Sequence, residues 1–469
     1  MKNAVTMIFT FLIAVCATAQ KQAALPKDLP PYGTQPAFQP PAVKASKLPN
    51  GLTVWLVAQP GLPKVSIRLV VLGGLAADPA NRPGLSELLA NTLSQGTKTR
   101  NARQIAEAIQ SAGGDLEVDA NRDAISVSTS ILSSKTEPAA TLLADVIENA
   151  TFPDEEVTLA KRNLSSSLEQ NDAEPGFQAD RALARILFGT GPYSVVAPTQ
   201  DSIRQMTAAE LRQQFALRFR PDQAILVAVG DFNAETMSTM MAEKFGGWKA
   251  QGAPPVAVNA APAASVAQKI TFIPRPNSVQ TTLLLGGFGP LRKDSDYEAA
   301  KVANAIYGGT FTSRLVVNIR EDKGYTYSPG SDLHTLRQAT VLLTRADVRN
   351  AVTGASLNEI IYEMNRMVTT SPTDEELSRA KRYLLGIEAV LLQLRSATAE
   401  EVANLWLNGL GPDGIAVYNQ KISATTTKDV DAAARKYFPA PRMSIIAVGD
   451  EKVIREALAP FAITLQEAK

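Results

Sequence analysis

The amino-acid sequence contains two copies of one unit, and this duplication limits the possible folds more than any other feature. Gly73-Gly74, Gly96-Thr97 and Thr99 recur as Gly286-Gly287, Gly309-Thr310 and Thr312, at a constant offset of 213 residues. Asp154-Glu155-Glu156 and Phe219 recur as Asp374-Glu375-Glu376 and Phe438, at offsets of 220 and 219 residues. Because such nearly constant offsets are hard to obtain by chance, the sequence predicts two lobes of similar structure.

Each copy predicts the same order of elements: two strands, a helix, a strand region, two helices and a closing strand. The predicted strands are β-branched, apolar runs bounded by Gly and Pro, at residues 52–57, 65–72 and 224–229, and again at 269–273, 279–285 and 444–448. The predicted helices that follow the opening strands are 83–93 and 297–307. Thr373 with Glu376 predicts a capping box before a helix at 377–385. Strands interspersed with helices predict an α+β protein.

The segments outside the two predicted lobes differ from them in amino-acid composition. A basic start at Lys2, an apolar run and the small-x-small pattern Ala17-Thr18-Ala19 predict a signal peptide at 1–19, with an uncleaved anchor as the alternative. Proline- and alanine-rich stretches predict an arm at 20–44 and a linker at 251–267. We therefore expect lobes at 45–250 and 268–469, an exported chain that is periplasmic if the source is a Gram-negative bacterium, and no membrane contact after signal removal.

Composition excludes several kinds of site. The chain has one histidine, His334, and one cysteine, Cys16, which lies in the predicted signal, so it can build neither a multi-histidine metal site nor a cysteine nucleophile. A lone histidine is more often solvated or hydrogen-bonded than catalytic. The formal net charge of +1, from 47 basic and 46 acidic residues, gives no reason to expect nucleic acid as a partner.

Several of these segments resemble the M16 peptidases, the family of pitrilysin, insulysin and the mitochondrial processing peptidase. They are Asn50-Gly51-Leu52-Thr53-Val54, Gly73-Gly74, Gly84-Leu85 and residues 93–97 in the first copy, and residues 308–315 and 319–327 in the second. The resemblance spans roughly residues 45 to 465. It implies two homologous tandem M16-type lobes, each a mainly antiparallel sheet covered by helices.

The resemblance also implies that the zinc site is lost. In active members of the family the first-lobe helix carries H-x-x-E-H, where two histidines bind zinc and the glutamate activates water. Here Glu87 and Asn91 occupy the ligand positions and Ala90 the general-base position. The third ligand, a glutamate on a later helix, corresponds best to Ser167, although Glu169 lies two residues away. An amide binds zinc far more weakly than imidazole, and alanine transfers no proton. We therefore expect no metal in this chain.

A second implied site is the pair Arg320 and Tyr327, seven residues apart in the second copy. The pair matches an arginine and a tyrosine that the family's second lobe presents to the substrate opposite the zinc. A guanidinium and a phenol can hydrogen-bond a peptide carbonyl and stabilise the charge that develops on it. Arg314 and Tyr325 are competing candidates, which only the spacing sets aside.

These implications favour a non-catalytic subunit of a heterodimeric zinc metallopeptidase that degrades or processes peptides. A partner chain with H-x-x-E-H would hold the zinc, and this chain would supply Arg320 and Tyr327 against an unfolded peptide. The alternative is a peptide-binding or assembly protein with no catalytic role, as with relatives in the respiratory bc1 complex, in which strands within 116–131 hold extended peptide by edge pairing. An independent enzyme using carboxylates such as Glu87 fits least, because no acid and base are paired at a suitable spacing.

Overall fold

The computed structural model describes residues 39–255, 258–260, 270–461 and 465–467. The predicted signal peptide, most of the predicted arm and much of the predicted linker lie outside the described residues. The described residues from Pro40 onward belong to one compact unit. None of the helices in the described ranges is both long enough and apolar enough to span a membrane.

The first lobe carries six strands. Its elements are β1 (Lys44–Lys47), β2 (Thr53–Ala58), β3 (Lys64–Leu72), η2 (Leu75–Ala77), α2 (Leu85–Leu93), α3 (Ala102–Ser111), β4 (Leu116–Ala120), β5 (Ala124–Leu132), η3 (Ser133–Lys135), α4 (Thr136–Asn149), α5 (Asp154–Asp172), α6 (Pro175–Phe188), η4 (Pro192–Ser194), α7 (Gln200–Gln205), α8 (Ala208–Arg218), η5 (Pro221–Gln223), β6 (Ala224–Gly230) and α9 (Ala234–Phe245).

The second lobe repeats this order. Its elements are β7 (Ile270–Pro274), β8 (Gln280–Phe288), α10 (Tyr297–Tyr307), α11 (Arg314–Val316), the π-helical segment η6 (Val317–Asp322), β9 (Gly330–Thr335), β10 (Thr340–Arg349), η7 (Asn350–Val352), α12 (Thr353–Thr369), α13 (Asp374–Leu391), α14 (Arg395–Leu407), α15 (Gly414–Ala424), α16 (Thr427–Tyr437), η8 (Ala440–Arg442), β11 (Ser444–Gly449), α17 (Glu451–Leu458), η9 (Ala459–Phe461) and β12 (Leu465–Glu467).

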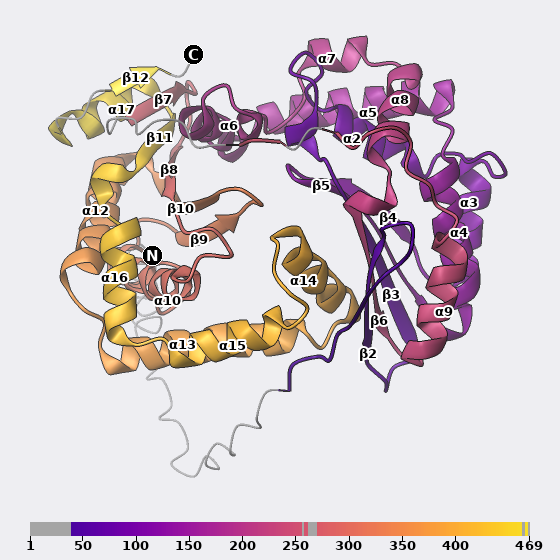
Figure 1. Ribbon diagram of the computed structural model, residues 1–469. Coiled ribbons are helices and arrows are strands. Elements are labelled where there is room, and N and C mark those ends of the chain that lie inside the picture. The colour runs from indigo at the N-terminus through magenta and orange to yellow at the C-terminus, as the bar shows by residue number, and fades with distance from the viewer. Residues whose placement is uncertain (1–38, 256–257, 261–269, 462–464, 468–469) are drawn as a thin grey trace, which may run out of the picture. The chain divides into compact units, whose positions relative to one another are not determined.

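Each lobe is built on one six-stranded sheet (Figure 1). The strand orders are β1-β2-β6-β3-β5-β4 and β12-β7-β11-β8-β10-β9, so β4 and β9 each form a sheet edge. Most neighbouring strands are antiparallel, the exceptions being β2 with β6 and β7 with both β11 and β12. The predicted α+β class and the two lobes of mainly antiparallel sheet are therefore confirmed. The predicted capping box is also present: Thr373 Oγ1 accepts from the Glu376 N–H at 3.1 Å, and Glu376 accepts from the Thr373 N–H at 2.9 Å.

The central strands are apolar on both faces, which requires a cover on each side. On β11, Ile445 and Ala447 join the core under the helices of the second lobe, whereas Ile446 and Val448 point to the other face, because successive side chains alternate. That other face is covered by α6, which comes from the first repeat and packs against β8 and β11. Its counterpart in the second repeat, α14, packs against β3 and β6 of the first sheet. The two lobes thus exchange equivalent helices.

The repeated glycine pairs support this packing in two different ways. A Cβ on Gly74 would lie 2.0 Å from the Asn121 carbonyl oxygen, so glycine is required for η2 to dock on the β4–β5 turn. A Cβ on Gly286 would lie 2.5 Å from a methyl group of Leu183, so glycine there allows α6 to approach β8 closely. The same motif thus serves a turn in one lobe and a helix contact in the other.

Two hairpin turns, one from each lobe, are joined by hydrogen bonds. Asp123 in the β4–β5 turn accepts from the buried Tyr193 hydroxyl and, at 2.9 Å, from the Arg337 N–H in the β9–β10 turn. The Tyr193 oxygen in turn accepts from the Gln338 N–H at 3.2 Å. Burial, followed by the nearby Asp123 charge, raises the pKa of Tyr193, so its phenol remains a neutral donor. This contact fixes the lobe junction near the edge strands β4 and β9.

The close approach at Gly74 leads to a stability prediction. We expect Gly74→Ala to lower the free energy of unfolding by about 1–3 kcal/mol, because the added methyl meets backbone atoms that cannot move independently. Gly247→Ala is the matched control, since an added Cβ there meets nothing within 4 Å, and should stay within about 0.5 kcal/mol of the parent. Urea unfolding measures both. Equal losses in the two variants would contradict the steric explanation.

Candidate functional site

Helix α2 is held at its N-terminus by a buried carboxylate. Asp78 accepts from the Gly84 N–H at 2.9 Å and from the Ser86 N–H at 3.0 Å, where the first turn of a helix has unpaired donors. Arg218 pairs with Asp78 at 3.1 Å, and the two side chains are only 3% and 1% exposed. Burial raises the pKa of Asp78, while the Arg218 charge and the hydrogen bonds from Ser86 oppose that rise. This ion pair and its hydrogen bonds therefore help to fix the position of α2.

The predicted degenerate zinc positions lie on the packed helices α2 and α5. Asn91 and Ser167 are exposed, Glu87 is half-buried, and Ala90 is buried against the first-lobe core. Glu169, the competing match for the third ligand, is exposed. Across the described part of the chain, no group of three or more His, Cys, Asp or Glu side chains is placed to hold a metal ion.

Glu87 has no suitable partner for acid–base chemistry. Burial, and then the negative charge of Asp78, raises the pKa of its carboxyl group. Asp78 is enclosed and already bound to Arg218, Ser86 and the start of α2, so it can neither reach nor activate a water. The arrangement gives no support for an independent enzyme built on Glu87.

The second-lobe pair forms an exposed cluster of cation and aromatic rings. The Arg320 guanidinium lies 5.1 Å from the ring centroid of Tyr327 and 5.2 Å from that of Phe311. Tyr327 is 83% exposed and Phe311 is 74% exposed, which is unusual for large rings. Arg320 also pairs with Glu321 at 3.2 Å. It lies in η6, a π-helical segment, and such segments occur frequently at functional sites.

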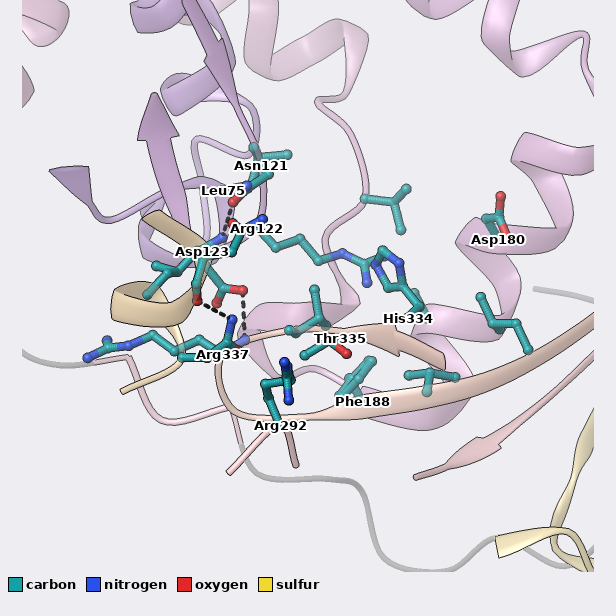
Figure 2. Close-up of a pocket in the computed structure, with 18 of the residues that line it drawn as sticks. Leu75, Asn121, Arg122, Asp123, Asp180, Phe188, Arg292, His334, Thr335 and Arg337 are labelled. Atoms are coloured by element: carbon teal, nitrogen blue, oxygen red, sulfur yellow. Dashed lines mark hydrogen bonds between the residues drawn. The ribbon is translucent and has the colours of Figure 1, made fainter. Parts of the chain in front are cut away.

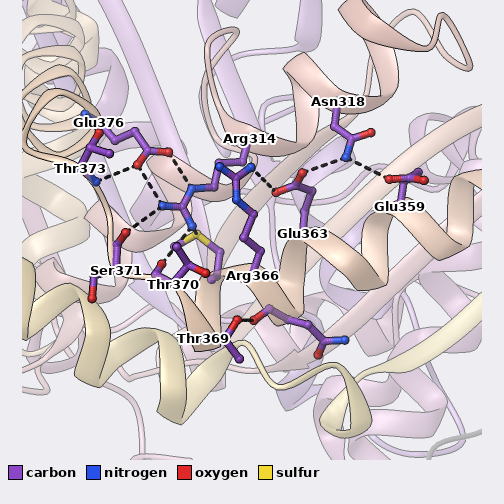
Figure 3. Close-up of polar contacts among 12 residues, drawn as sticks. Arg314, Asn318, Glu359, Glu363, Arg366, Thr369, Thr370, Ser371, Thr373 and Glu376 are labelled. Atoms are coloured by element: carbon purple, nitrogen blue, oxygen red, sulfur yellow. Dashed lines mark hydrogen bonds and ion pairs between the residues drawn. The ribbon is translucent and has the colours of Figure 1, made fainter.

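The competing guanidinium, Arg314, has a structural role. It is 4% exposed and binds Glu376 through two hydrogen bonds of 2.7 Å and 2.9 Å, and its remaining N–H groups face Thr370, Ser371 and Met367 (Figure 3). The competing phenol, Tyr325, is half-buried. Burial thus distinguishes Arg320 from Arg314 and Tyr327 from Tyr325, whereas the sequence distinguished them only by spacing. Sequence reasoning did not single out Phe311, although it lies inside the quoted segment 308–315.

The two predicted sites are not joined to each other. Among the described residues, no hydrogen bond or ion pair links Arg320 or Tyr327 to Glu87, Asn91 or Ser167. His334 lies elsewhere, on the edge strand β9, where it lines a cavity. Partial burial, and then the charge of Arg122, lowers the pKa of His334, so the imidazole is neutral at pH 7.

The duplicated lobe, the α2–α5 helix pair and the exchanged helices define a two-lobed, metallopeptidase-type fold without a zinc ligand set in its described residues. The chain belongs to the M16 peptidase family. Residues 53–194 match the family described as insulinase (peptidase family M16), and residues 205–384 match the peptidase M16 inactive domain.

Related proteins carry both active and inactive descriptions. An uncharacterized zinc protease of Mycobacterium leprae is 27% identical over 83% of this chain and 88% of its own length. A non-peptidase homolog, YmxG, of Helicobacter pylori is 24% identical over 74% of this chain and 80% of its own length. The crystal structure of a peptidase M16 inactive domain from Pseudomonas fluorescens superposes with a TM-score of 0.82 at 25% identity, covering 91% of this chain and 100% of that one.

The Arg314–Glu376 pair leads to a prediction about pH. The Arg314 hydrogen bonds lower the pKa of Glu376 from 4.5 to about 2, so the pair stabilises the fold fully above pH 4.5, and this stability is lost as pH falls toward 2. We expect Glu376→Gln to keep the capping box but to lower neutral-pH stability by about 2–3 kcal/mol, with a smaller loss between pH 4.5 and 2. Urea unfolding at several pH values checks this. The prediction would be contradicted if the free energies of unfolding of the parent and of Glu376→Gln changed in parallel with pH.

Proposed function

We propose that this chain is the non-catalytic subunit of a heterodimeric zinc metallopeptidase. The partner is an M16 chain with an intact H-x-x-E-H motif, and it binds the zinc. This chain contributes Arg320 and Tyr327 to the peptide held at that zinc. Export to the periplasm of a Gram-negative source belongs to the same proposal.

The observation that carries the proposal is the contrast between the two lobes. The α2–α5 helix pair has an asparagine, a serine and one carboxylate in place of a ligand set. The second lobe presents Arg320 between two exposed rings, and no acceptor other than Glu321 pairs with this guanidinium among the described residues. A guanidinium and a phenol can stabilise a developing oxyanion, but they activate no water by themselves. Such a cluster can therefore assist peptide hydrolysis only beside a metal that another chain holds.

The test is reconstitution with an H-x-x-E-H chain from the same organism. We expect the isolated chain to carry no stoichiometric zinc, and the pair to co-elute and to cleave an internally quenched peptide faster than the partner alone. Within that complex, Arg320→Ala and Tyr327→Phe should each lower kcat/KM by roughly 10²- to 10³-fold, because each removes a donor to the oxyanion. Zinc content, size-exclusion chromatography and peptide hydrolysis supply the measurements.

Matched controls come from the same lobe. Tyr362 on α12 is exposed and Arg379 on α13 is half-buried, as Arg320 is, so Tyr362→Phe and Arg379→Ala should leave hydrolysis unchanged. Failure of the chain to associate with any H-x-x-E-H chain, or to raise cleavage, would overturn the proposal. A stable complex that stays fully active with Arg320→Ala and Tyr327→Phe would remove its catalytic part.

One observation favours a second candidate, a peptide-binding or assembly protein with no catalytic role. Among the described strands, β4 lies at the edge of its sheet and pairs with β5 alone, which leaves its outer backbone groups available to an added strand. Peptide binding by the isolated chain, together with no gain in hydrolysis from any H-x-x-E-H partner, would favour this candidate over the first.

A further inference from the structure

A cavity of about 670 Å³ lies beside the joined hairpin turns and is separate from both sites described above. Its apolar wall comes from α6, with Leu183, Leu187 and Phe188, and from Val341 and Leu343 of β10. The volume falls within the range of sites that bind small molecules or short peptide segments. Polar groups enter it from the β4–β5 turn and from β9, as Figure 2 shows, and also from α14.

Arg122 enters this cavity without an anionic partner among the residues that the structure describes. Figure 2 shows its side chain reaching from the β4–β5 turn toward the His334 imidazole on β9. None of the described residues accepts a hydrogen bond from its guanidinium or forms an ion pair with it. Burial lowers the pKa of Arg122, and Asp180 and Asp123 oppose this only through space. A desolvated charge without a partner is costly, so proteins retain one where a ligand completes the pair.

The neighbouring carboxylates are already engaged. Asp123 accepts from Tyr193 and the Arg337 N–H, as described above, and Asp180 accepts from Arg345 at 2.5 Å. Neither carboxylate forms an ion pair with Arg122 among the described residues. The Arg122 guanidinium therefore lines the cavity with a positive charge that a bound anion can pair with.

The backbone that carries Arg122 is held rigidly. Its carbonyl oxygen accepts from the Ala76 N–H at 2.9 Å, and the Asn121 side chain accepts from the N–H groups of Asp123 and Ala124 at 2.8 Å and 2.9 Å. A turn fixed at this many points presents its side chain with little loss of entropy on binding. Such preorganisation is typical of a binding group rather than of a surface charge.

Opposite charges lie on another wall. Glu400 and Glu401 enter from α14, and neither carboxylate forms an ion pair or accepts a hydrogen bond from another described residue. The exposed Glu400 carboxylate therefore repels an anion from α14, and the Arg122 end attracts it, where the neutral His334 can donate an N–H. The charges thus favour one orientation of a bound anionic group.

We propose that this cavity binds a carboxylate of a peptide, with Arg122 as the residue that pairs with it and His334 beside it. The carboxylate is either the C-terminus or an acidic side chain, and both match the planar, two-pronged guanidinium. The inference rests on the proposed function only in taking peptide as the ligand. It assigns the substrate class as peptides that carry an accessible carboxylate.

The experiment uses isothermal titration calorimetry on the full chain alone, without a partner. Three acetylated decapeptides of the same Ala, Val, Ser and Gln composition serve as probes: one with a free C-terminus, one amidated, and one amidated with a single internal Gln replaced by Glu. We expect at least one carboxylate peptide to bind roughly 10- to 100-fold more tightly than the neutral amide, the scale of a charge-assisted hydrogen bond. Which one does so identifies the source of the carboxylate.

Variants test whether Arg122 is responsible. Arg122→Gln should abolish the preference for carboxylate, whereas Arg103→Gln, which removes an 86%-exposed arginine of the same lobe, should preserve it. Thermal unfolding of Arg122→Gln should occur at or above the parent temperature, because the variant removes an unpaired charge. Equal binding of all three probes, no binding, a preference that survives Arg122→Gln, or a marked loss of stability in that variant would overturn the inference.

These outcomes separate the two proposals, because no partner is present in the titration. A chain that activates an H-x-x-E-H partner but shows no carboxylate preference refutes the cavity assignment and leaves the subunit role intact. A chain that prefers carboxylates through Arg122 but joins no partner supports the cavity assignment and refutes the subunit role.

Discussion

The exchange of α6 and α14 is the contact on which both lobes depend. The central strands β6 and β11 are buried on both faces, and one face of each sheet is covered by a helix from the other repeat. Removing either helix would expose apolar strand surface worth about 25 cal/mol per Å². Neither lobe is therefore complete alone, and this explains why the duplication persists although the two copies have diverged in detail.

Helix α2 is held in this fold by contacts that involve none of the residues at the proposed zinc positions. The buried Asp78–Arg218 pair anchors the start of α2, and breaking such a pair by removing one partner typically costs about 3–5 kcal/mol. The side chains at 87, 90, 91 and 167 can thus change without releasing the helix. Residue 91 of the first repeat corresponds to Asn304 of the second. Asn304 has a structural role, because its side chain donates to the Ser331 carbonyl at 3.0 Å.

The sequence predicted the repeat, the central strands, the helix at Thr373 and the α+β class, because each depends on local pattern. It could not assign α6 and α14 to the opposite sheets, since periodicity shows which face of a helix is apolar but not which sheet receives it. Spacing alone distinguished Arg320 from Arg314 in the sequence, because the physical difference between them depends on the distant Glu376. Arg122 gave no signal for a similar reason: its surroundings are assembled only where two turns from different repeats meet.

The Arg320 cluster and the Arg122 cavity are alike in one physical respect. Arg320 lies between rings that are mostly in solvent, and Arg122 is partly buried without an anionic partner among the described residues, so the fold itself satisfies neither guanidinium fully. Stability alone favours covered rings and paired charges, because an unsatisfied group lowers the free energy of unfolding. A lobe that lost only catalysis would have no physical reason to keep such groups. Both groups are instead those through which this chain would contact a peptide under the two proposals above.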